Sequence, residues 1–354
     1  MRIGIFDPYL DDLGGGEKYM ISIASCLSKK NDVVVFWDNS EDLKNVSERF
    51  SLDISRVKLA KNIFSSRYSF FGRLIKSSKF DIIVVLSDGS IPLVLSKKLF
   101  IHLQQPFPNL KMSLNLILKK LRVSSFFCNS LFTKSFIDKE FNISSSVVYP
   151  PVDSNLKKGN KENIILHVGR FRAQNVGYDY KKQEVMVDIF KKMVDDGLKN
   201  WKLIIAVGLK SEDEERFRRL QEKTKRYPIE FMVNLNNGDL HKIYSIAKIY
   251  WHASGYGEDL DKKPELAEHF GISTVEAMGA GVVPVVINLG GQREIVEDGK
   301  NGYLWNTKQE LIKKTIELTK DNLKLKRMSD EAMNRSKIFS KDRFCKDIES
   351  IFFK

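Results

Sequence analysis

Short apolar runs rich in β-branched residues alternate along the chain with longer stretches that are apolar on one side only. The short runs predict buried strands, and the one-sided stretches between them predict helices. The strand candidates in the first part of the chain are residues 2–6, 32–37, 82–86, 99–103, 125–128 and 147–149. Strands separated by helices predict an open parallel sheet with helices on both faces.

The pattern breaks at residues 149–153, Tyr-Pro-Pro-Val-Asp, and a lysine-rich stretch, 154–161, follows. Prolines and a charged stretch between two patterned halves predict a linker between domains. The second half offers strands at 164–168, 203–208, 229–233, 249–252 and 283–287, and helices at 184–196, 240–247, 273–280, 309–319, 322–336 and 341–352. We therefore expect two doubly wound α/β domains in tandem, with ligands bound where the carboxyl ends of the two sheets face a shared cleft.

The apolar runs are too short to span a bilayer, and the first residues resemble a strand more than a secretory leader. The three cysteines, Cys26, Cys128 and Cys345, are far apart and form no Cys-x-x-Cys pair. This usage predicts free thiols, with no disulfide and no metal site. Both observations favour a reducing cytoplasm.

The net charge of +13 is concentrated in residues 56–122, which contain 13 lysines and arginines against two aspartates. A basic surface attracts phosphates on a nucleic acid, an anionic membrane or an acceptor, although it can also be a merely solvated face. Within it, 62–80 and 110–122 combine aromatic or leucine side chains with cations. These stretches suit the interface of an anionic membrane, or they are core helices with solvated lysines.

Three glycines, Gly14, Gly15 and Gly16, follow the first strand and precede a helix. Glycines permit positive φ and a close approach of the backbone to a ligand, and a helix N-terminus suits a phosphate. The spacing is neither that of the dinucleotide fingerprint nor that of the P-loop. A phosphate contact and a simple tight turn both remain open.

Arg170 stands at the end of the strand 164–168, and Lys181 and Lys182 open the next helix. Such cations can clamp a diphosphate and neutralise charge as it leaves, or they are solvated surface groups. Glu268 and Glu276 flank a predicted turn from loop into helix, where carboxylates can accept hydrogen bonds from sugar hydroxyls. Further on, Gly290-Gly291 can bring backbone N–H groups against an anion.

Residues 268–305, with glutamates eight positions apart, resemble the donor-binding core of the family 4 glycosyltransferases. Five more segments resemble motifs of that family and occur in its order: LGGGEKY, FIHLQQP, NSLFTKSFI, VVYPPVD, and VGRF with its downstream lysine. The resemblance implies the GT-B fold, in which two Rossmann-like domains, 1–153 and 154–336, face a central cleft. It also implies a C-terminal helix, 337–354, that packs back on the N-terminal domain.

The resemblance further implies a retaining, metal-independent transfer from a UDP- or GDP-linked sugar to a glycan or lipid-linked acceptor. Glu276 would hold the ribose, Glu268 the transferred sugar, and Arg170 with Lys181 the diphosphate. His102 would lie beside the reacting sugar. The remaining donor contacts would come from Gly15, Gly16, Lys182, Phe270, Gly271 and Ile272. No metal or cofactor is expected.

Two departures from the family pattern leave questions open. Residues 172–180 lengthen the loop after Arg170, so either Lys181 or Lys182 can be the phosphate ligand. Residues 255–266 form an acidic and basic insertion that is either a lid or a solvated loop. The rival readings are a GT-B disaccharide phosphorylase or synthase with a soluble acceptor, and a non-catalytic anion-binding protein.

Nucleic-acid binding is not expected, because no RNA-binding, zinc-finger or helix-turn-helix motif is present. We expect a cytoplasmic protein, and contact of its basic stretches with the inner face of the membrane stays open beside the solvated alternative.

Overall fold

The computed structural model describes residues 1–12, 14–107, 113–153, 156, 158–171 and 181–353. The chain forms two compact units. The N-terminal unit consists of Met1–Pro151 with Lys341–Lys354, and the C-terminal unit consists of Val152–Ser340. The sequence predicts these divisions at residues 153 and 336. Residues 172–180 and part of the stretch 110–122 lie outside the described residues.

The N-terminal unit is built on a parallel sheet of seven strands in the order β3-β2-β1-β4-β5-β6-β7. The strands are β1 (Arg2–Phe6), β2 (Asp32–Phe36), β3 (Val57–Ala60), β4 (Ile82–Leu86), β5 (Lys98–Leu103), β6 (Ser125–Cys128) and β7 (Ser146–Val147). The chain moves outward from β1 to β3 and then returns to add β4 beside β1. The switch point of this sheet therefore lies between β1 and β4.

Alternate strand residues of this sheet enter two separate cores. Helices α1 (Gly15–Leu27), α2 (Ser40–Phe50) and α13 (Lys341–Phe352) contribute to one core, on the face that receives Ile3 and Val84. Helices α4 (Leu114–Lys120) and α5 (Leu131–Phe141) contribute to the other, which receives Val34 and Val85. Helix α3 (Phe70–Ser77) lies between β3 and β4 in sequence. Burial on both faces explains why the strands are almost continuously apolar.

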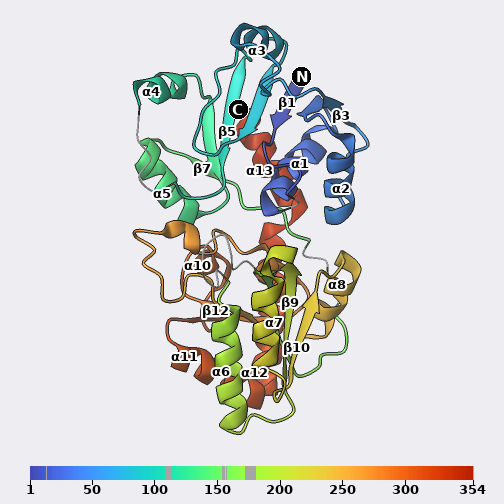
Figure 1. Cartoon of the computed structure of the whole chain (residues 1–354), viewed down its shortest axis with the longest axis vertical. Helices are drawn as coiled ribbons and strands as arrows, with labels where there is room; N and C mark the ends of the chain where they lie inside the picture. Colours follow the sequence, from blue (N-terminus) through green and yellow to red (C-terminus); the bar gives the residue numbers. More distant parts are fainter. Residues whose placement is uncertain (13, 108–112, 154–155, 157, 172–180, 354) are drawn as a thin grey trace. The chain divides into compact units, whose positions relative to one another are not determined.

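The C-terminal helix α13 belongs to the N-terminal unit, as the sequence predicts (Figure 1). Phe344, Ile348 and Phe352 recur every fourth residue, so they share one face and are buried in the core beside α1. An ion pair at 3.3 Å between Lys30 and Glu349 adds a contact at the surface.

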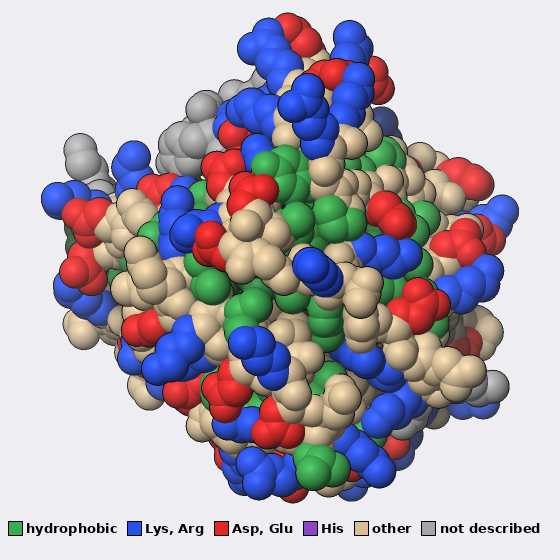
Figure 2. Space-filling model, turned by 90° about the horizontal axis from the view of Figure 1, so that it is seen from below, with side chains coloured by type: hydrophobic (Ala, Val, Ile, Leu, Met, Phe, Trp, Pro, Cys, Tyr) green, Lys and Arg blue, Asp and Glu red, His purple; other side chains and the backbone are tan. Residues whose placement is uncertain are grey.

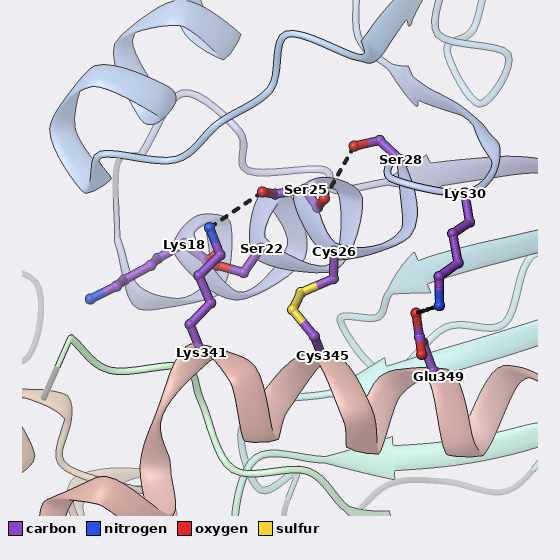
Figure 3. Close-up of a disulfide and its surroundings, with 9 residues drawn as sticks. All are labelled: Lys18, Ser22, Ser25, Cys26, Ser28, Lys30, Lys341, Cys345 and Glu349. Atoms are coloured by element: carbon purple, nitrogen blue, oxygen red, sulfur yellow. Dashed lines mark hydrogen bonds and ion pairs between the residues drawn. A yellow bond between two sulfur atoms is a disulfide. The ribbon is translucent and has the colours of Figure 1, made fainter.

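A disulfide joins Cys26 of α1 to Cys345 of α13, with 5.4 Å between the two Cα atoms (Figure 3). The prediction of free thiols is therefore wrong for this pair, and correct for Cys128, which is free and buried. The prediction failed because 319 residues separate the two cysteines in sequence, and only the return of α13 brings them together. The thiol argument for a reducing compartment is lost with it.

The C-terminal unit is a parallel sheet of six strands in the order β10-β9-β8-β11-β12-β13. The strands are β8 (Ile164–Phe171), β9 (Lys202–Leu209), β10 (Ile229–Val233), β11 (Ile249–His252), β12 (Val283–Ile287) and β13 (Tyr303–Trp305). The helices are α6 (Gln183–Asp195), α7 (Glu214–Glu222), α8 (Asn237–Ile246), α9 (Ile272–Gly279), α10 (Gln292–Ile295), α11 (Lys308–Lys320) and α12 (Asn322–Ser336). The strand order changes direction between β8 and β11, so the switch point of this sheet lies there.

Charge is mixed on the face of the molecule shown in Figure 2. Lysine and arginine side chains alternate with aspartate and glutamate, and hydrophobic side chains form only small areas among them.

Candidate functional site

The switch point of the C-terminal sheet carries the predicted cations. Arg170 is the last but one residue of β8, is half-buried, and pairs with Gly208 of β9. Its carbonyl accepts a hydrogen bond of 3.2 Å from Nε2 of Gln183, the first residue of α6. Lys182 caps the same helix in a left-handed conformation, with φ of 59°. The end of β8 and the start of α6 are thus tied together at this edge of the sheet.

Glu268 is the centre of a charged cluster. Nζ of Lys181 lies 2.6 Å from Oε2 of Glu268, and Nε2 of His252 lies 2.8 Å from the same oxygen. Burial alone would raise the pKa of Glu268, but the charge of Lys181 and the hydrogen bond from His252 outweigh it and hold this pKa well below its usual range. Glu268 is therefore an ionised carboxylate held in place by two donors.

The neighbouring Lys182 has a different partner. Its Nζ forms an ion pair with Oε1 of Glu258, which belongs to the insertion 255–266. Both side chains of this pair are mostly buried, with 12% and 19% exposed. The two lysines thus have different acidic partners, Glu268 for Lys181 and Glu258 for Lys182, and which of them contacts a diphosphate stays a prediction.

Glycines shape the loop that carries Glu268. The amide of Gly291 donates to the carbonyl of Glu268 at 2.8 Å, and a Cβ atom at Gly290 would lie 2.3 Å from that carbonyl oxygen. Gly271 caps α9 with φ of 119°, a conformation that favours glycine. The expectation that Gly290-Gly291 offers its N–H groups to an anion needs correction for Gly291, whose N–H bonds within the protein, and stays a prediction for Gly290.

Glu276 lies just over one turn into α9, where the sequence predicts it. Its Oε2 accepts a hydrogen bond of 3.3 Å from the hydroxyl of the buried Tyr244. Burial raises the pKa of Tyr250, and the charges of Glu268 and Glu276 raise it further. Both acids therefore act on one tyrosine and belong to the same region of the unit.

The other predicted donor contacts surround the start of α9. Phe270 is buried, and its ring centroid lies 5.3 Å from that of Phe339. Ile272, the first residue of the helix, is half-buried. Phe270 therefore acts at least in part as a packing residue that fixes the loop.

Gly15 and Gly16 open α1 in the N-terminal unit. Gly14, its N-cap, has φ of −107° and ψ of −164°, so the positive φ expected of this loop is not used there. Instead, the N–H of Gly14 donates to the Glu17 carboxylate, and a Cβ atom at Gly16 would lie 2.3 Å from the side chain of Gln104. The glycines allow a close approach, in this case to another part of the same unit.

His102, in β5, is completely buried. Its ring stacks on Tyr19 with 4.1 Å between centroids, and its Nδ1 lies 3.2 Å from the carbonyl of Phe127. Burial lowers the pKa of His102 to about 3, so the imidazole is neutral and donates from Nδ1. Among the described residues its buried Nε2 has no hydrogen-bond partner. The predicted role beside the reacting sugar stays a prediction.

Sequence reasoning missed two polar groups at the switch points. His252 ends β11 and contacts Glu268, although a lone histidine after an apolar run gives little warning of this. Asp7 follows β1 directly and is 1% exposed, and burial followed by the charge of Glu17 raises its pKa to about 8. Their shared signal is position, since each stands at the carboxyl end of a strand beside a switch point.

Two Rossmann-like domains in tandem, each built on a parallel sheet, are the plan of the GT-B fold of glycosyltransferases. Solved structures share this fold over the whole chain. Anabaena HepE in complex with UDP matches with a TM-score of 0.74 and 17% identity, over 99% of each chain. Sucrose-phosphate synthase from Thermosynechococcus elongatus matches with a TM-score of 0.70 and 12% identity, over 100% of this chain and 98% of the other.

Residues 152–335 match the family Glycosyl transferases group 1, and this chain belongs to that family. A GDP-Man:Man(3)GlcNAc(2)-PP-Dol alpha-1,2-mannosyltransferase of Dictyostelium discoideum is 28% identical over 221 residues. That match covers 58% of this chain but only 41% of the relative's length. Alpha-1,3/1,6-mannosyltransferase ALG2 of the same organism is 24% identical over 86% of both chains.

Proposed function

We propose that this protein is a retaining family 4 glycosyltransferase that moves a hexose from a nucleotide-diphosphate sugar to a hydroxyl of an acceptor, without a metal ion. The observation that carries the proposal is the cluster of Lys181, Glu268 and His252 beside Arg170 at the switch point of the C-terminal sheet. It offers cations for phosphates and an ionised carboxylate for sugar hydroxyls at the edge where such sheets bind ligands.

The two cations would act on the diphosphate. When a sugar leaves, negative charge grows on the departing phosphate, and fixed cations stabilise that charge. Arg170 offers a guanidinium that can bind phosphate oxygens in pairs, and Lys181 offers a point charge. In the structure Lys181 is neutralised by Glu268, so donor binding would draw it toward the phosphates.

The two acids would hold hydroxyl groups. A carboxylate accepts hydrogen bonds from two neighbouring hydroxyls, and Glu268 stays ionised because of its two donors. We assign Glu268 to the transferred hexose and Glu276 to the ribose. With the substrate positioned in this way, catalysis would come from orientation and charge stabilisation.

We propose a UDP- or GDP-linked hexose as the donor. GDP-Man is part of the names of the mannosyltransferase relatives, and HepE has been solved with UDP and with UDP-glucose. The names of the same mannosyltransferases include an acceptor linked through PP-Dol, which supports a lipid-linked glycan as the acceptor of this chain. The similarity to sucrose-phosphate synthase supports the alternative of a soluble sugar acceptor.

A surface of the N-terminal unit supports a lipid-linked acceptor, and we call it the basic apolar surface. It consists of exposed apolar side chains on α3, on α4 and at two nearby positions: Phe70, Phe71, Ile75, Leu95, Leu114, Ile117, Leu118 and Leu121. Two hydrogen bonds connect its parts. The amide of Leu95 donates to Ser77 at the end of α3, and Arg122 donates to the carbonyl of Ser96. These bonds link the end of α3, through residues 95 and 96, to Arg122, two residues beyond α4.

The same stretch of sequence supplies cations. Arg67, Lys76, Lys79, Lys97 and Arg122 are exposed, with Arg67 paired to Asp38 and Lys97 to Asp81, and within 56–122 only Asp81 and Asp88 are acidic. Apolar side chains among lysines and arginines fit the interface of an anionic bilayer. Among the described residues, no helix is both long enough and apolar enough to cross a membrane. We therefore propose peripheral contact with an anionic membrane through this surface.

Nucleotide release from a panel of UDP- and GDP-linked hexoses tests the proposed function. The panel is offered with a lipid-linked acceptor, with soluble sugars, and with added EDTA. We expect release from one donor class, faster with the lipid-linked acceptor and unchanged by EDTA. Release only with soluble sugars would favour the synthase alternative, and failure to bind any nucleotide would overturn the proposal.

A further inference from the structure

His252 is a buried polar side chain with a specific contact. It is 1% exposed, its Nε2 lies 2.8 Å from Glu268, and the hydroxyl of Ser254 is 3.5 Å away. Its Nδ1 is also buried and has no hydrogen-bond partner within the described part of the chain. A buried polar group is costly unless its hydrogen bonds are made. The hydrogen bond with Glu268 therefore offsets part of the free-energy cost of burying the His252 ring.

The direction of this hydrogen bond follows from the surroundings of His252. Burial lowers the pKa of His252, and Glu268 opposes this only in part, so the ring is neutral. The charged or titratable neighbours are Glu268, Lys181 and His167, whose ring centroid lies 6.1 Å away. Because Oε2 of the ionised Glu268 is an acceptor only, the single ring proton sits on Nε2 and is donated to it.

Two donors share one carboxylate oxygen. Lys181 and His252 both contact Oε2 of Glu268, at 2.6 and 2.8 Å. Lys181 has a long, flexible chain and a charge that a diphosphate attracts, whereas His252 is fixed in the last position of β11. When phosphates draw Lys181 away, His252 is the donor that remains.

We propose that His252 is a positioning residue that keeps the Glu268 carboxylate ionised and oriented while Lys181 moves to the donor diphosphate. This inference rests on the proposed function of the site. Without the histidine, Lys181 would be the main donor to the half-buried Glu268 carboxylate. Moving Lys181 from Glu268 to the phosphates would then cost more free energy. Phosphate binding and the orientation of Glu268 would then compete for one lysine.

Three substitutions separate this role from simple packing. His252→Gln keeps an N–H donor near the position of Nε2, whereas His252→Phe keeps a ring without a donor. Glu268→Gln removes the carboxylate charge that the histidine balances. All are tested in the full chain by calorimetric binding of UDP and GDP, by kcat and KM for the donor, and by the unfolding temperature.

We expect His252→Phe to weaken nucleotide binding and to lower kcat/KM by roughly 10- to 100-fold, because a hydrogen bond to a charged group is lost. His252→Gln should stay within about fivefold of the natural protein. In a Glu268→Gln background, His252→Phe should have little further effect on nucleotide affinity, since no carboxylate is left to compete for Lys181. If His252→Phe does not fold, His252→Met takes its place.

Equal losses for His252→Phe and His252→Gln would overturn the inference, and so would a full effect of His252→Phe in the Glu268→Gln background. In both cases the natural protein would still bind its nucleotide, so the proposed function would stand. If the natural protein binds neither UDP nor GDP, the proposed function fails and this inference fails with it.

Discussion

The two units share a doubly wound plan, but their switch points carry different chemistry. In the C-terminal unit, an ionised glutamate contacts a lysine and a histidine at the ends of the central strands. In the N-terminal unit, the corresponding edge has Asp7, whose pKa is raised, and β5 has the neutral, buried His102. One sheet thus presents fixed charges, and the other buries uncharged groups.

Under the proposed function, this difference would divide the work of the transferase between the two units. Fixed charges in the C-terminal unit suit a phosphorylated donor, which is itself charged. Neutral groups in the N-terminal unit suit an acceptor that reacts through a hydroxyl. The sheet order is alike in both units, so the side chains at the strand ends, and not the fold, carry the assignment.

The largest expected effect is that of Arg170→Ala in the C-terminal unit. We expect kcat/KM for the donor to fall roughly 100- to 1000-fold, because a preorganised cation at the leaving phosphate is lost. Arg219→Ala is the matched control, since Arg219 forms an exposed ion pair with Glu215 on α7. Donor kinetics measure the effect, and equal kcat/KM values for the two variants would show that Arg170 is not part of the site.

In the N-terminal unit, Asp7→Asn should stabilise the protein. The pKa of Asp7 is about 8 in the folded protein against an ordinary 3.8, so between these values the folded state binds one proton more than the unfolded state. The free energy of unfolding therefore falls as the pH rises from about 4 to about 8. At pH 7 the asparagine removes a cost of up to about 4 kcal/mol.

Unfolding in denaturant at several pH values measures this effect. The difference between Asp7→Asn and the natural protein should grow from pH 5 to pH 8. A difference that does not change with pH would show that Asp7 ionises normally.

Removal of the disulfide by substitution tests whether the stability of the N-terminal unit can change without a change in nucleotide binding by the C-terminal unit. Cys26→Ser should lower the stability of the N-terminal unit by about 2–4 kcal/mol, because the unfolded chain loses a cross-link. Nucleotide binding by the C-terminal unit should not change. Thermal unfolding with and without nucleotide measures both, and a loss of nucleotide affinity in this variant would contradict independent units.

The smallest effect concerns the basic apolar surface. The double variant Phe71→Ser, Leu121→Ser should bind anionic vesicles about tenfold more weakly. In the double variant Lys76→Gln, Lys79→Gln, the free energy of vesicle binding should weaken by about 1 kcal/mol for each cation removed. Leu323→Ser is the control, because Leu323 is 84% exposed on α12 of the other unit. Vesicle sedimentation measures the binding. Unchanged sedimentation of both double variants would exclude membrane contact there.

Much of the fold is readable from the sequence because parallel strands buried on both faces are continuously apolar. Residues 82–86, 125–128 and 249–252 are predicted with the bounds that the structure has. The edge strand β3 is not predicted from the sequence, because its four residues are only partly buried and include a lysine. Periodicity detects burial, so it misses elements that are half exposed.

The site is readable in part. Glu268, Glu276, Arg170 and Lys181 are predicted from the sequence because their spacing and neighbours form ordered motifs, and their roles stay predictions. His252 and the partner of Lys182 are not predicted, since contacts across 16 and 76 residues depend on how loops fold back. The disulfide was missed for the same reason, and only His252 has a local signal in the sequence, its position at the end of a strand.

Titration of UDP and GDP into the natural protein, Lys181→Met and Lys182→Met tests the central claim most directly. The cluster around Glu268 predicts that one nucleotide binds the natural protein, that Lys181→Met weakens it at least about 30-fold, and that Lys182→Met, whose lysine pairs with Glu258, changes it less than about fivefold. Equal losses in both variants, or no nucleotide bound by the natural protein, would contradict the account.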